Sequence, residues 1–202
     1  MSPRAYKLGQ RQAAADETRR RIVAATRAVL AAGGPAEFTV DAVAKQADVG
    51  RMTVYYQFES KRGVLEALFD DLANRGLMPS LRPVFEERDP SRALDGVIGA
   101  FATFWNSDRI VLRRARALAA LDHEIAESVR ARDELRRGHL RKVLERLYAQ
   151  RTPAPTRPLA SSIDILHMLT SFETFDALLI DSRRFEEATT ILRELASAVL
   201  AS

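Results

Sequence analysis

Apolar residues recur every three or four positions along most of this chain, and this spacing limits the fold more than any other feature. The spacing places apolar side chains on one face of an α-helix, whereas a half-buried β-strand needs strict alternation, which no long stretch shows. Residue usage also leans to Ala, Leu, Glu and Arg, which favour helices. We therefore expect an all-α protein of about nine helices.

The pattern predicts a flexible arm over residues 1–15, a first helix over 16–32, and a break at Gly33-Gly34-Pro35. Two short helices follow, one capped by Thr39 and one reaching Phe58, and a longer helix begins at Glu59-Ser60. The stretch 79–90, which contains several prolines, is expected to be a loop. Further helices are expected near 91–106, 109–120, 122–150, 158–181 and 184–201.

Composition excludes several classes of protein. The chain has no cysteine, so disulfides, thiolate metal sites and thiol catalysis are excluded. The longest apolar run, Val97 to Trp105, is too short to cross a bilayer, and no apolar segment follows the basic N-terminus as in a signal peptide. We expect a cytoplasmic protein.

Positive charge is concentrated at the N-terminal end. The net charge is +4, and residues 1–62 hold eleven Lys or Arg against six Asp or Glu, whereas the remainder is slightly negative. This asymmetry suggests that the N-terminal part meets a polyanion, although basic N-terminal segments are often only solvated.

The segment 39–58 has the parts of a helix-turn-helix: a supporting helix, a tight turn, and a second helix that can enter the DNA major groove. In the first helix, Val40, Val43, Ala44 and Ala47 share one face. The turn needs a residue that tolerates positive φ, which Asp48 supplies, and Val49 can fill the gap between the helices. Val54 and Phe58 are expected to point inward from the second helix.

The run from Ala44 to Phe58, AKQADVGRMTVYYQF, followed by Lys61 and Leu65, resembles the DNA-binding signature of the tetracycline-repressor (TetR) family. The resemblance covers about residues 17–72 and implies a helix-turn-helix domain at 16–62 and a helical effector-binding and dimerisation domain at 63–202. Two positions depart from the family pattern. Asp48 stands where the turn usually has Gly, and Gly50 stands where a Ser-type cap usually begins the recognition helix.

The resemblance implies contacts of two kinds with double-stranded DNA. Phosphate contacts fix the register of a protein on the duplex, and base contacts carry the specificity. Arg51 is the leading candidate for specificity because a guanidinium can donate two hydrogen bonds to one guanine. The implied phosphate contacts are Thr39, Tyr55 and Lys61, and the residues facing bases or adjoining backbone are Arg51, Met52, Thr53 and Tyr56.

The C-terminal two-thirds would, by the same resemblance, dimerise and sense a small molecule. A two-turn recognition helix offers few contacts, so tight binding calls for a symmetric pair on two half-sites. The same apolar stripes could equally be ordinary core faces. The candidate dimer interface is Ile163, Leu166, Leu169, Phe172, Leu179, Phe185, Ala188, Leu192, Leu195 and Val199. The candidate effector pocket is Phe101, Phe104, Trp105, His123, His139, Met168, Phe172 and Phe175.

The expected function is therefore a DNA-binding transcriptional regulator, a homodimer that represses from a palindromic operator and is released by a small molecule. No cofactor is expected, and three scattered histidines without cysteine make a poor metal site. An enzyme is the first alternative, but the sequence contains no GxSxG, P-loop or HExxH motif. The second alternative is a helical interaction module whose DNA-binding motif is vestigial.

Overall fold

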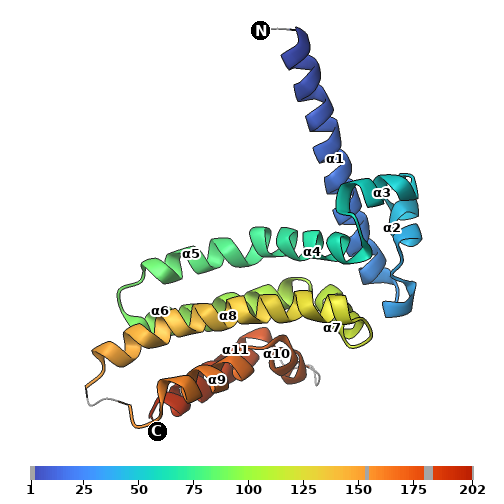
Figure 1. Cartoon of the computed structure of the whole chain (residues 1–202). Coiled ribbons are helices and arrows are strands. Elements are labelled where there is room, and N and C mark those ends of the chain that lie inside the picture. The colour runs from blue at the N-terminus through green and yellow to red at the C-terminus, as the bar shows by residue number, and fades with distance from the viewer. Residues whose placement is uncertain (1–2, 153–154, 180–183, 202) are drawn as a thin grey trace. The chain divides into compact units, whose positions relative to one another are not determined.

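The computed structural model describes residues 3–152, 155–179 and 184–201, and these residues form helices α1 to α11 without any strand (Figure 1). The all-α prediction is confirmed. The chain divides into two compact units, one made of Met1–Asp71 and Arg113–Ser128 and the other of Leu72–Leu112 and Val129–Ser202. Both α7 and α8 therefore contribute residues to each unit. None of the described helices combines the length and the apolar character needed to cross a membrane.

The first unit contains the predicted helix-turn-helix. It comprises α1 (Pro3–Ala32), a 3₁₀ turn (Pro35–Glu37), α2 (Val40–Gln46), α3 (Arg51–Phe58) and α4 (Lys61–Leu72). Figure 1 shows α2 and α3 beside the C-terminal half of α1. Apolar side chains from each helix meet in one core because the helical period gives each helix a single apolar face. The fully buried members include Ile22, Leu30, Phe38, Val43, Val54, Leu65 and Leu68.

The expected flexible arm over residues 1–15 was wrong for residues 3–15, because α1 is helical from Pro3, and residues 1–2 lie outside the described residues. Residues 10–15 contain only Gln, Arg and Ala, all strong helix formers, so they extend a helix that packing has already nucleated. A side-chain hydrogen bond from Gln12 Nε2 to Asp16 Oδ1, 3.0 Å long, spans one turn of this extension.

The expected loop over residues 79–90 was also wrong, because α5 (Met78–Glu86) occupies most of it and only 87–89 is irregular. Leu81 and Val84 are buried at helical spacing. A π-helical turn (Ala73–Leu77) precedes α5, where the Met78 amide donates to the Ala73 carbonyl. Pro79 then stands in the first turn of α5, where its missing N–H leaves few helical bonds unmade.

The second unit holds α5, α6 (Pro90–Ser107), α9 (Leu159–Leu169), α10 (Phe172–Leu178), α11 (Phe185–Ala201) and parts of α7 (Arg109–Ala119) and α8 (His123–Gln150). Helix α6 is central, since it contacts α5, α10 and α11. The single helix expected over 158–181 is two helices. Ser171 caps α10 by accepting the Thr174 amide at 3.2 Å, so the chain turns after Thr170.

Candidate DNA-binding interface

Helices α2 and α3 are placed by a capped start and a tight turn. The Thr39 hydroxyl accepts the Ala42 amide at 3.1 Å and caps α2, as predicted. Asp48 has a φ of 52°, so this residue adopts the left-handed conformation expected of the turn. Gly50 begins α3 without a side-chain cap, and its carbonyl accepts the Thr53 amide at 2.9 Å. The departures from the family pattern therefore leave the turn intact.

Helix α3 has one buried face and one exposed face. Val54 and Phe58 are buried, as predicted, and Val49 is half-buried in the turn. On the opposite face, Met52 is 76% exposed and Tyr56 is 87% exposed. Met52 and Tyr56 are four residues apart, so they lie on the same face of α3 and form one exposed patch, and such patches mark binding surfaces.

Arg51 stands at the first position of α3 with its guanidinium held at two points. Its Nη1 lies 3.1 Å from Asp41 Oδ2 on α2, and its Nη2 donates to the Tyr55 hydroxyl at 3.3 Å. The hydrogen bond with Tyr55 and the nearby charge of Asp41 raise the pKa of Arg51, so the side chain stays a cation. Both members of the ion pair are exposed, so DNA can reach them.

The remaining predicted DNA contacts lie on the same unit. Thr39 is exposed, while Thr53, Tyr55 and Lys61 are half-buried. Lys61 starts α4 with its Nζ 5.3 Å from the centre of the Phe38 ring. Thr39 immediately precedes α2, Arg51 begins α3, and Tyr55 lies one turn further along α3.

Sequence reasoning missed two residues of this unit. Asp41 was not singled out, although it contacts Arg51. Arg19 of α1 was also missed: its Nη1 donates to the Gln57 carbonyl at 2.7 Å, and its Cζ lies 4.3 Å from the centre of the Phe58 ring. Asp41 and Arg51 are ten residues apart in the sequence, and Arg19 and Gln57 are 38 residues apart. The helical period relates only residues within one helix, so it could not predict either contact.

Residues 22–68 match the model of the bacterial regulatory proteins of the tetR family, a match that contains α2, the turn and α3. The chain therefore carries a DNA-binding domain of the tetR family. This domain indicates a DNA-binding transcriptional regulator, and regulators that carry it are in general not enzymes. No curated protein matches the sequence of the whole chain.

Solved structures of transcriptional regulators share the fold along nearly the entire chain. A TetR transcription regulator from Haloarcula marismortui has a TM-score of 0.71 at 22% identity, over 92% of this chain and 97% of that one. A transcriptional regulator from Rhodococcus sp. has a TM-score of 0.70 at 21% identity, over 91% and 96% of the two chains. A protein from Saccharomonospora viridis, solved in complex with choline, has a TM-score of 0.72 at 13% identity, over 90% and 96%.

The TetR resemblance also implied an effector pocket, and the structure brings only part of its predicted lining together. Phe101, Phe104 and Phe172 surround Trp105, with ring centres 4.9 to 5.9 Å from it, and the indole N–H donates to the Thr170 carbonyl at 3.0 Å. All four rings are buried.

The other predicted pocket residues have different surroundings. Phe175 is buried and packs against Phe185, whereas Met168 is 59% exposed. His123 belongs to the first unit, where it is exposed and lies near Glu127. His139 stays near the aromatic group, with its ring centre 6.3 Å from that of Phe101 and 5.4 Å from that of Phe85. Within the described residues, no group of three His, Asp or Glu could hold a metal ion.

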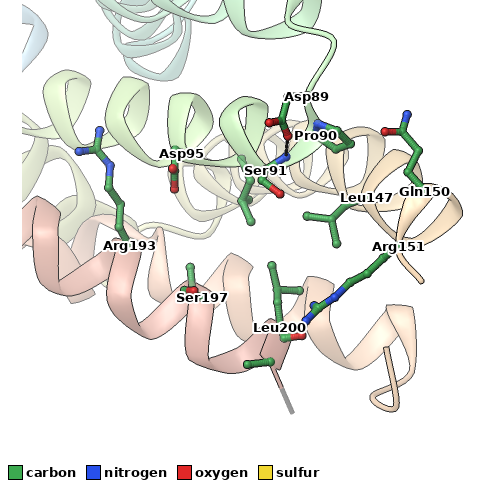
Figure 2. A pocket seen from close by; sticks show the side chains of 13 residues that line it. Asp89, Pro90, Ser91, Asp95, Leu147, Gln150, Arg151, Arg193, Ser197 and Leu200 are labelled. Atoms are coloured by element: carbon green, nitrogen blue, oxygen red, sulfur yellow. Dashed lines mark hydrogen bonds between the residues drawn. The ribbon is translucent and has the colours of Figure 1, made fainter. Parts of the chain in front are cut away.

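A groove of about 530 Å³ lies between the start of α6 and the ends of α8 and α11 (Figure 2). Asp89 and Asp95 stand on one wall, Arg193 and Ser197 on another, and Arg151 donates to the Leu200 carbonyl at its edge. None of the predicted effector residues lines this groove.

The predicted dimer residues fall into two groups. Seven are covered by the packing of one chain alone, while Phe185 and Val199 are half-buried and Leu195 is 44% exposed. The alternative reading of these stripes as core faces fits the covered residues, which are Ile163, Leu166, Leu169, Phe172, Leu179, Ala188 and Leu192.

Proposed function

We propose that this protein is a ligand-responsive repressor that binds a palindromic operator as a homodimer in the cytoplasm. The observation that carries the proposal is the exposed face of α3, where Arg51, Met52 and Tyr56 stand on a helix anchored by buried Val54 and Phe58. A recognition helix of eight residues reaches few bases, so a second copy on a second half-site supplies the missing affinity.

Selection of bound fragments from a random duplex library tests DNA recognition and symmetry together. We expect a palindromic consensus with half-sites about 34–36 Å apart or a multiple of this spacing. Affinity for the selected duplex should fall steeply between low and moderate salt, because each phosphate contact releases a counterion. A consensus without symmetry would contradict the dimer, and no enrichment would favour the vestigial module.

The effector proposal rests on the aromatic group around Trp105. Aromatic rings can bind apolar molecules or organic cations, and His139 and Thr170 add polar atoms nearby. The Saccharomonospora viridis protein supports the proposal only in showing that a protein of this fold can hold a small organic molecule.

Coupling would pass through the segment 60–75, which continues from the helix-turn-helix into the second unit. A ligand that binds two conformations with different affinity would tilt this segment and change the spacing of the two recognition helices. Thermal-shift screening of small organic molecules, followed by operator titration with each hit, tests this step. Operator affinity that no bound compound alters would contradict it.

A further inference from the structure

We infer that Asp41 is a specificity-determining residue, which positions the guanidinium of Arg51 for a guanine edge. The inference rests on the proposed reading of DNA by α3. It adds a role for α2 beyond that of a supporting helix.

Two helices hold the Arg51 side chain from different sides. Asp41 lies in the first turn of α2, and its Oδ2 pairs with Nη1 at 3.1 Å. Tyr55 lies one turn further along α3, and its hydroxyl accepts from Nη2 at 3.3 Å. The Arg51 Cζ is also 5.5 Å from the centre of the Tyr55 ring. An exposed arginine would otherwise sample many rotamers, and ordering them opposes binding.

The contacts with Asp41 and Tyr55 leave enough donors for a base. A guanidinium carries five N–H groups, and these two bonds use one from each terminal nitrogen. Three donors remain, and a bidentate contact with guanine O6 and N7 needs two. Arg51 can therefore read guanine without first breaking its contact with Asp41.

The negative charge of Asp41 also favours specific over non-specific binding to DNA. A carboxylate on a DNA-facing surface repels phosphates, so it weakens binding to every duplex alike. Its contact with Arg51 assists only a duplex that has guanine at the matching position. Asp41 thus raises the ratio of specific to non-specific affinity, which is how specificity is measured.

The test compares the selected consensus duplex with one in which the guanine read by Arg51 is replaced. Arg51→Ala first identifies that position as the one where discrimination disappears. Asp41→Ala should then lower the discrimination ratio by roughly fivefold, the most that one exposed ion pair usually supplies. Asp41→Asn keeps an oxygen acceptor and should lower the ratio less.

Asp48→Asn is the matched control. It removes one negative charge from the same helix-turn-helix, and Asn tolerates the positive φ of this turn. It should tighten binding to both duplexes and leave their ratio unchanged. If Asp41→Ala keeps the wild-type discrimination ratio while Arg51→Ala loses it, the role of Asp41 is overturned and the Arg51 assignment stands. Unchanged ratios in both variants overturn the Arg51 assignment as well.

Discussion

Arg19 and Phe58 join the first and third helices of the DNA-binding unit: the guanidinium carbon lies 4.3 Å from the ring centre, and Nη1 donates to the neighbouring Gln57 carbonyl. The carbonyl belongs to the last turn of α3, which lacks helical partners of its own. A cation placed at this end of a helix is also favourable for its dipole.

Replacing Arg19 with Ala should therefore lower the free energy of unfolding by about 1–2.5 kcal/mol, the sum expected of one hydrogen bond and one exposed cation–π contact. Urea denaturation measures this change. The control is Arg20→Ala, which removes an exposed arginine whose ion pair with Glu17 lies within α1 and which should change stability little. Equal effects of the two substitutions would contradict the role of Arg19.

Arg51→Ala should lower affinity for the selected operator by roughly five- to hundredfold and relax one base position. The reason is the loss of a bidentate contact with guanine. Fluorescence anisotropy with a labelled duplex measures the change at fixed salt. Unchanged affinity and preference would refute the assignment of Arg51.

Gly63 lies where α4 turns back on α3, and a Cβ at this position would collide with the Phe58 carbonyl oxygen. Gly63→Ala should therefore lower stability by about 1–3 kcal/mol, as expected for overpacking. Gly138→Ala is the opposite case, because Gly138 lies inside α8 with open space around its Cα. This substitution should raise stability by about 0.5–1 kcal/mol. Thermal melting measures the change in stability of each variant. A lower melting temperature for both variants would contradict the prediction.

His139 is half-buried beside Phe85 and Phe101, and its buried Nδ1 has no hydrogen-bond partner in the described part of the chain. Burial, with a smaller contribution from the charge of Lys142, lowers the pKa of His139 below its ordinary value of 6.5. The unfolded chain therefore takes up its proton first as the pH falls, so stability decreases below about pH 6.5 and is retained above it.

His139→Leu removes this proton uptake and should make stability less dependent on pH between 7.5 and 5. Urea midpoints at several pH values measure the difference. Some dependence should remain, because burial also lowers the pKa of His167. Identical pH profiles for the variant and the wild type would contradict the prediction.

Leu195 is the exposed apolar residue on the stripe of α11 that we expect to face a partner subunit. A charge buried at such an interface is costly, so Leu195→Glu should shift the protein from dimer to monomer. Sedimentation velocity measures the mass. Leu135→Glu on α8 is the control, since Leu135 is 66% exposed and lies outside the expected interface. Unchanged mass in Leu195→Glu would contradict this face.

Local patterns in the sequence were enough to predict the helical class, the helix-turn-helix and the inward direction of Val54 and Phe58. These features depend on local period, capping and turn preference, which few neighbouring residues decide. The positive φ of Asp48 follows from the same local chemistry. The prolines of residues 79–90 led to the wrong prediction of a loop. The chain is helical there because the π turn accommodates Pro79 and because helix α5 buries Leu81 and Val84.

Which side chains meet across helices depends on how the helices pack. Asp41 contacts Arg51, and Arg19 contacts Phe58, because helix packing brings separate turns together, and no sequence period records that geometry. The predicted dimer residues between Ile163 and Val199 are a second feature that their spacing in the sequence could not assign. A helix face that packs in the core of one chain and a helix face that packs against a partner subunit have the same apolar spacing. The packing of one chain shows that seven of the ten predicted interface residues are already buried.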